Sequence, residues 1–224
     1  MDNVYIVSAV RTAVGRSKAG SAIAHVRPDD LGAAVIAEAV KRSGVPADRI
    51  DDCIMGCAFP EAESGMNVGR IALQASGLPD SISGETINRF CSSGLEAMAT
   101  AAAKIEVGML DCAIAGGLES MSIIPIGGNK LLPNPKLTKD RPRAYSGMGL
   151  CADNVAKDFK ITREECDQWA LRSNQRAVAA IAAGKFKDEI VPLTVTGTWR
   201  FAELASWATS VIVSGPGCER LAAP

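Results

Sequence analysis

The sequence predicts an α/β protein whose mostly parallel β-sheet carries helices on both faces. Three observations support this prediction. Short apolar runs alternate with segments of helical periodicity, glycines stand where those helices should end, and the spacings suit right-handed crossovers between parallel strands. We therefore expect an α/β core over residues 1–122, a loop domain with irregular and helical segments over 123–195, and a tail of different character over 196–224.

The first strand and the first helix are the clearest elements of the core. Residues 4–10 (VYIVSAV) form a short apolar run rich in β-branched side chains, which is typical of a buried strand. Pro28 and the two acidic residues after it suit the first turn of a helix, and Gly44 suits its C-terminal cap. The same signals predict the remaining elements of the core: a strand at 53–57, a helix at 68–75, a strand at 85–89, a helix at 92–107 and a strand at 111–115.

The helix expected over 92–107 is rich in alanine and carries few charges. Because small side chains occupy every face of it, this helix can be buried nearly all round. Beyond Ser122 the pattern dissolves into prolines and glycines, and so long an irregular stretch usually has a function, here as a binding loop. Thr162 and Glu165 then form a capping box at the start of a further helix that runs to Gly184.

Composition and charge exclude several classes of protein. The chain has 224 residues, and its 24 Lys and Arg balance 25 Asp and Glu with no run of five like charges, so no nucleic-acid partner is expected. No apolar run approaches the ~20 residues that span a bilayer, and no basic segment precedes an apolar one at the N-terminus. We expect a cytoplasmic protein without a membrane partner.

The seven cysteines indicate reduced thiols, because their number is odd and no CxxC pair occurs. Cys53 and Cys57 are spaced for metal ligation, but the segment reads as a strand and the single histidine is His25. Structural zinc needs four Cys or His ligands at recognisable spacing, so no metal site is expected. Cys151 is left open, and four cysteines are expected in the core: Cys53, Cys57, Cys112 and Cys166.

Cys91 stands apart because it lies at the start of the long helix expected over 92–107. Unpaired backbone N–H groups and the positive end of the helix dipole favour the thiolate there, and the thiolate is the nucleophilic form of cysteine. Cys91 is therefore the best candidate nucleophile. The alternative is a structural role, since cysteine is among the residue types that are most often buried.

Several stretches of the sequence together resemble the thiolase family. The most specific is NRFCSSGLEAM at residues 88–98, which is similar to the family's active-site motif. The resemblance extends from Met1 to about Val195, and the loop at 127–135 looks like the degradative 3-ketoacyl-CoA branch of the family. The other matching stretches are YIVSAVRT at 5–12, RPDDL at 27–31, AGGLESMS at 115–122, and GMGL at 147–150 followed by DNVA at 153–156.

This resemblance implies a reaction and a set of substrates. In the family, the cysteine corresponding to Cys91 accepts the acyl group, so a 3-ketoacyl-CoA is cleaved by CoA, or formed in the reverse Claisen condensation, through S-acyl-Cys91. The resemblance also places Met148, with Gly149 beside it, against the pantetheine arm of CoA; an ordinary apolar loop contact is the alternative for Met148. CoA and acyl-CoA thioesters are then substrates, no cofactor is needed, and a homo-oligomer is expected.

The sequence also departs from the family. Family members are nearly twice as long, and their second half carries a Gly-His-Pro histidine, an Asn-Glu-Ala-Phe segment and a second catalytic cysteine. We expect this chain to lack that half, to lack the final strand of the first half, and to be inactive alone. Residues 196–224 match nothing in the family and resemble an out-of-frame extension or a fusion scar; a divergent but genuine closing segment is the alternative.

Three functions remain as hypotheses. The first is a thiolase-type acyltransferase, of which this chain supplies the nucleophile. The second is a non-catalytic fragment that acts as an assembly or interaction module. The third is a condensing enzyme of the ketoacyl-synthase type, which the motifs around Cys91 and at 115–122 favour less than a thiolase.

Overall fold

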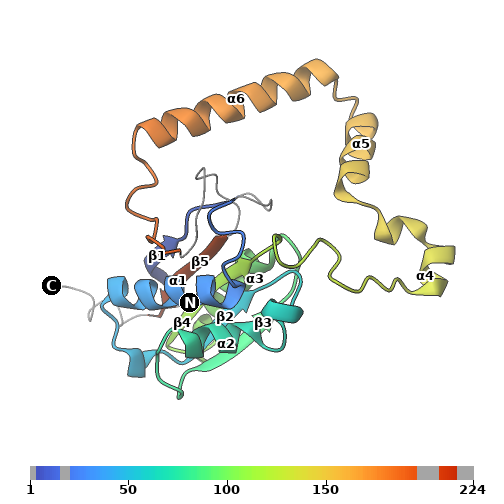
Figure 1. Cartoon of the computed structure of the whole chain (residues 1–224). Coiled ribbons are helices and arrows are strands. Elements are labelled where there is room, and N and C mark those ends of the chain that lie inside the picture. Colours follow the sequence, from blue (N-terminus) through green and yellow to red (C-terminus); the bar gives the residue numbers. More distant parts are fainter. Residues whose placement is uncertain (1–3, 16–20, 196–206, 216–224) are drawn as a thin grey trace. The chain divides into compact units, whose positions relative to one another are not determined.

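The computed structural model describes residues 4–15, 21–195 and 207–215. The chain divides into two compact units, of which the first comprises Met1–Asn129 and Glu189–Pro224 and the second comprises Lys130–Asp188 (Figure 1). The second unit falls within the loop domain expected over 123–195, and the chain returns to the first unit before that expected domain ends.

A mixed sheet of five strands in the order β1-β5-β4-β2-β3 forms the centre of the first unit. Strand β2 is parallel to both β3 and β4, whereas β5 is antiparallel to both β4 and β1. Four strands therefore run in one direction and β5 runs against them, which confirms the predicted α/β class. The strands are β1 (Tyr5–Arg11), β2 (Asp52–Gly56), β3 (Ser83–Ile87), β4 (Cys112–Glu119) and β5 (Trp207–Ser214).

Strand β5 corrects the expectation that the final strand is missing. It pairs along its whole length with β4, from Cys112 opposite Ser214 to Glu119 opposite Trp207, and β1 covers its other edge. Its residues Val211 and Val213 are buried. This segment forms a strand because it contains a run of β-branched apolar residues, which is typical of a half-buried or buried strand.

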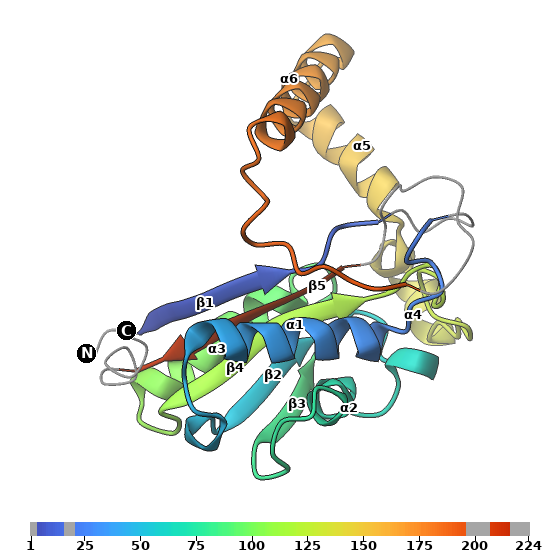
Figure 2. The same ribbon diagram turned by 60° about the vertical axis from the view of Figure 1, so that its left-hand side comes forward.

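Helices cover both faces of this sheet. Figure 2 shows α1 (Pro28–Ser43) and α2 (Val68–Ala75) in front of the sheet and α3 (Ser93–Glu106) behind it. Successive residues of a strand point to opposite faces. Accordingly, Ile114 of β4 belongs to the core cluster beneath α1 and α2, and its neighbour Ala113 belongs to the cluster beneath α3.

Helix α3 is less buried than the sequence predicts. Its buried residues form one stripe at helical spacing, Ser93, Ala97, Ala101 and Ile105, whereas Leu95 is 65% exposed. The expectation of burial nearly all round is wrong for this structure, because the described part of the chain covers only the face of α3 that packs on the sheet.

The second unit contains three helices, α4 (Pro135–Asp140), α5 (Met148–Asp158) and α6 (Arg163–Ala182). None of these helices has a buried residue. The capping box is confirmed at the start of α6: Thr162 Oγ1 accepts the Glu165 N–H at 3.2 Å, and the Glu165 carboxylate accepts the Thr162 N–H at 2.8 Å. Over the described residues, no helix combines the length and apolar character needed to cross a bilayer.

The cysteines test the predicted core. Cys53, Cys57 and Cys112 are buried, as expected, and Cys151 is half-buried. Cys166 is exposed, so its assignment to the core is wrong. It lies on α6, and the apolar positions on that helix bury nothing against the rest of the described chain.

Candidate active site

Cys91 lies in the tight turn that joins β3 to α3. Ser92 is the N-cap of α3, so Cys91 precedes the cap by one residue, and its side chain is exposed. Phe90, immediately before it, has a left-handed backbone with φ 47°, which is uncommon for a residue other than glycine. The hydroxyl of Ser93 braces this turn, since it accepts the Arg89 N–H at 2.9 Å and donates to the Phe90 carbonyl at 2.5 Å.

Three glycines let the start of α3 approach the sheet closely. A Cβ at Gly56, the last residue of β2, would lie 2.4 Å from the Ser93 carbonyl carbon. A Cβ at Gly117 on β4 would lie 3.2 Å from the Gly56 oxygen and 3.4 Å from the Gly94 Cα. Backbone therefore packs on backbone at this point, and the position of the Cys91 turn is set by the strands.

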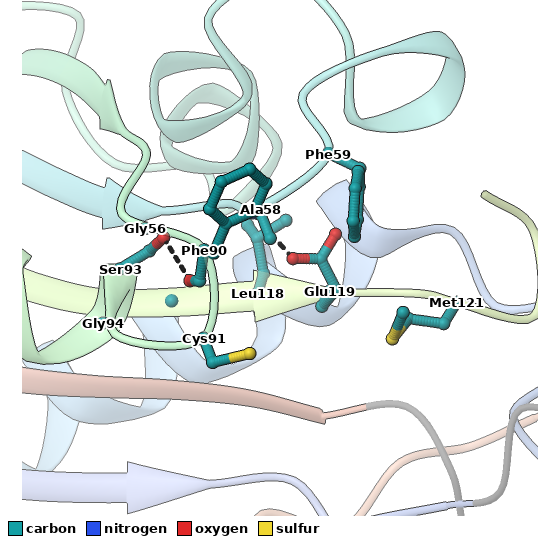
Figure 3. A pocket seen from close by; sticks show the side chains of 11 residues that line it. Gly56, Ala58, Phe59, Phe90, Cys91, Ser93, Gly94, Leu118, Glu119 and Met121 are labelled. Carbon is teal, nitrogen blue, oxygen red and sulfur yellow. Dashed lines mark hydrogen bonds between the residues drawn. The ribbon is translucent and has the colours of Figure 1, made fainter. Parts of the chain in front are cut away.

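A hollow of about 180 Å³ opens beside Cys91. Figure 3 shows the Cys91 thiol, the Glu119 carboxylate and the Met121 side chain around this space, with Phe59 and Phe90 at its edge. The hollow forms where β2 and β4 end and α3 begins, and such carboxyl edges of parallel strands are common ligand sites. The remaining lining residues are Gly56, Ala58, Ser93, Gly94, Gly117 and Leu118.

Glu119 supplies the carboxylate of this hollow. Its Oε2 accepts the Ala58 N–H at 2.8 Å, and its Oε1 faces the Cys57 Sγ at 3.7 Å. Burial raises the pKa of Glu119, and backbone N–H groups of Ala58 and Phe59 oppose that effect in part. A half-desolvated carboxylate in a mostly apolar hollow is the kind of group that marks functional sites.

Cys57 contrasts with Cys91 in the same region. Burial, followed by the charge of Glu119, raises the pKa of the Cys57 thiol to about 12. Burial likewise raises the pKa of Cys53. Both thiols therefore stay protonated at neutral pH, whereas Cys91 is the exposed thiol of the first unit among the described cysteines.

The other candidate residues lie in the second unit. Met148 and Gly149 lie in the first turn of α5. Met148 is 75% exposed, and a Cβ at Gly149 would meet no atom within 4 Å apart from its chain neighbours and the backbone of its own helix. Their contact with a pantetheine arm stays a prediction. The described residues contain no group of three His, Cys, Asp or Glu side chains placed to hold a metal ion.

Sequence reasoning did not single out Glu119 as a site residue. It lies within the motif at 115–122 that carried the family resemblance. Glu119 is also a charged residue at the end of a strand that is otherwise apolar, and this contrast is a signal of a site at the sheet edge.

Comparison with known proteins is consistent with this geometry. The family model for the thiolase N-terminal domain matches residues 4–204. The 3-ketoacyl-CoA thiolase of Bacillus subtilis (strain 168) is 50% identical over 198 residues, which are 88% of this chain and 50% of that protein. The beta-ketoadipyl-CoA thiolase of Pseudomonas putida is 41% identical over 212 residues, covering 87% of this chain and 52% of that protein.

A solved structure has the same architecture. The acetyl-CoA acetyltransferase of Bacillus anthracis matches with a TM-score of 0.81 and 28% identity, covering 99% of this chain and 68% of that one. This chain spans about half the length of the curated relatives it matches.

Proposed function

The chain belongs to the thiolase family, and from this we propose that it carries the nucleophile of a thiolase-type acyltransferase acting on 3-ketoacyl-CoA. The Cys91 thiolate attacks the 3-keto carbonyl carbon, the bond between C2 and C3 breaks, and its electron pair leaves on acetyl-CoA, which takes up a proton. The CoA thiolate then attacks S-acyl-Cys91 and releases acyl-CoA with free Cys91. Covalent capture divides a difficult carbon–carbon cleavage into two acyl transfers.

The observation that carries this proposal is the setting of Cys91. Its thiol is exposed, it stands at the N-terminal end of α3, and it borders a mostly apolar hollow. The positive end of the helix dipole favours the negative oxygen of a tetrahedral intermediate formed at Cys91. The names of the relatives, 3-ketoacyl-CoA thiolase and beta-ketoadipyl-CoA thiolase, support a thioester of a 3-keto acid as the substrate.

CoA recognition is part of the same proposal. We assign the pantetheine arm to Met148 and Gly149 at the start of α5, with CoA and acyl-CoA thioesters as the partners and no cofactor. We also propose that the protein forms a homo-oligomer. Sedimentation of the purified chain at micromolar concentration as a monomer would contradict the oligomer without touching the role of Cys91.

Turnover needs more than a nucleophile. Thiolysis requires a base, donors for the oxyanion and an acid for the departing carbon, and the single histidine of these 224 residues, His25, lines a different pocket from Cys91. General acid–base help contributes ~10²–10⁴-fold and one oxyanion donor ~10²–10³-fold. We therefore propose that the 224 residues alone acylate Cys91 slowly and turn over at least ~10⁴-fold below an intact relative.

The test is to incubate the purified chain with acetyl-CoA and to locate the acetyl group by peptide mass spectrometry. We expect the label on Cys91, and Cys91→Ala should abolish it. Cys166→Ala is the matched control, because Cys166 is also exposed but lies on α6 in the other unit. Equal labelling of Cys91 and Cys166 would overturn the nucleophile assignment and favour the non-catalytic module.

A further inference from the structure

A chain of hydrogen bonds crosses the ends of three strands and finishes at the turn between β3 and α3 that carries Cys91. It begins at Glu119, the last residue of β4, whose Oε2 accepts the Ala58 N–H at 2.8 Å. Ala58 follows the end of β2 by two residues. The other carboxylate oxygen of Glu119 faces the Cys57 Sγ at 3.7 Å, so both oxygens hold the segment that leaves β2.

The chain continues from Ala58 to the turn. The Ala58 carbonyl accepts a hydrogen bond from Asn88 Nδ2 at 2.9 Å, and Asn88 follows the last residue of β3. The Asn88 Oδ1 then accepts the Phe90 N–H at 2.9 Å. Phe90 is the residue with φ 47° that immediately precedes Cys91. The peptide groups of Ala58 thus form the middle link between a carboxylate on β4 and a strained residue beside the nucleophile.

Aromatic contact supports the same connection. The rings of Phe59 and Phe90 are tilted by 55° with their centroids 6.2 Å apart, so the segment after β2 also packs on the turn through side chains. Figure 3 shows both rings beside Glu119 and Ala58 at the edge of the hollow. A shift of the 57–59 segment therefore reaches Phe90 by two routes.

We propose that Glu119 is a positioning residue, which holds Cys91 at the start of α3 through Ala58, Asn88 and Phe90. The proposal rests on the role of Cys91 proposed above. A purely structural role would end at Ala58, where Glu119 ties the end of β4 to the segment after β2. A positioning role requires in addition that the hydrogen bonds continue through Asn88 to Phe90, the residue before Cys91. Asn88 is exposed and contributes little to the core, so replacing it tests the positioning role with little effect on core packing.

The test measures how fast iodoacetamide alkylates Cys91 at pH 7, followed by peptide mass spectrometry. Glu119→Ala leaves the Ala58 N–H without its acceptor, and we expect the rate at Cys91 to fall at least about threefold as the thiol leaves the helix terminus. Glu119→Gln keeps an acceptor oxygen and should stay within about twofold of the wild type. Glu38→Ala on α1 removes a different glutamate, one that pairs with Arg42, and should leave the rate unchanged.

The variant Asn88→Ala distinguishes a positioning role of Glu119 from a purely structural one. It should slow alkylation as Glu119→Ala does, and the double variant should be no slower than either single variant, because both changes break one chain. An unchanged rate in Asn88→Ala, or effects that multiply in the double variant, would overturn the proposal. If Glu119→Ala does not fold, as judged by circular dichroism, Asn88→Ala alone decides.

Acetylation by acetyl-CoA distinguishes this proposal from the proposed function. If wild-type Cys91 is not acetylated while the alkylation rates follow the expected order, the acyltransferase assignment fails and the positioning role stands. If wild-type Cys91 is acetylated but Glu119→Ala and Asn88→Ala react like the wild type with both reagents, the positioning role fails and the acyltransferase assignment stands.

Discussion

The sheet unit and the helical unit of this chain are ordered by different interactions. In the sheet unit, Leu31, Ile54 and Ile114 are fully buried between the sheet and its helices. In the helical unit, α4, α5 and α6 bury no residue, and local contacts order them instead. In α6 these contacts are the capping box, the ion pair of Arg163 with Asp167 and the guanidinium of Arg172 over the Trp169 ring at 4.1 Å.

This difference indicates how firmly each group of residues in the proposed function is held in place. Local helix contacts are worth only a few tenths of a kcal/mol each, whereas a buried aliphatic side chain contributes about 1.5–3 kcal/mol. The turn that carries Cys91 packs backbone on backbone against the buried strands, and the hydrogen bonds through Ala58 and Asn88 act on that packed base. Met148 and Gly149 stand in the unit that relies on local order, as segments that close over ligands commonly do.

The largest expected effect comes from the core of the sheet unit. Ile54→Ala removes a fully buried side chain of β2, and we expect it to lower the free energy of unfolding by about 2–5 kcal/mol. Leu171→Ala on α6 is the matched control, because that side chain is 60% exposed and should change stability by less than about 0.5 kcal/mol. Urea denaturation checks both, and similar losses in the two variants would break the comparison between the units.

Gly56 lies where the core of the sheet unit packs against the turn that carries Cys91. In Gly56→Ala the new methyl group would meet the Ser93 carbonyl carbon at 2.4 Å, so we expect a loss of about 1–3 kcal/mol and slower alkylation of Cys91. Gly149→Ala on α5 meets no atom within 4 Å and should stabilise its helix by up to about 1 kcal/mol. A well-tolerated Gly56→Ala with normal Cys91 reactivity would contradict the backbone packing described for this turn.

The local stability of the helical unit should depend on the capping residues of its helices. Thr162→Ala removes the side chain that accepts the Glu165 N–H, and we expect a local loss of about 1 kcal/mol in α6. Hydrogen exchange should be faster in the first turns of α6 and unchanged in the strands. Thr138→Ala, which removes a side-chain hydrogen bond to the backbone carbonyl of Asn134 at the N-cap of α4, serves as a control that leaves α6 exchange unaltered.

The smallest effect is a pH dependence at Glu119. Because burial raises the pKa of Glu119 above its ordinary 4.5, the native state holds this proton more tightly than the unfolded chain. The corresponding stability is fully present below about pH 4.5 and is lost as the pH rises through the raised pKa. The stability of the wild type relative to Glu119→Gln should therefore fall as the pH rises from about 4.5 through the raised pKa. Urea denaturation across this range measures the difference, and a constant difference would show that Glu119 has an ordinary pKa.

Much of the fold was predictable because its signals are local. Pro28 and Gly44 bracket α1, Thr162 and Glu165 begin α6, and the apolar β-branched runs mark the strands. Cys91 was also recognisable, since a cysteine at the start of a helix is a property of neighbouring residues. Such signals depend on the backbone conformation of a few consecutive residues, which the side chains there largely determine.

The sequence by itself thus determined the α/β class, the approximate places of the helices and strands over residues 1–122, and the candidate nucleophile. Only the tertiary structure decided that β5 enters the sheet between β1 and β4, and that Cys166 is exposed. It also decided that Glu119 meets Ala58, 61 positions away in the chain. The reason is that strand order, helix burial and contacts between loops depend on pairings between distant segments, and a residue's immediate neighbours do not encode which distant segment will cover it.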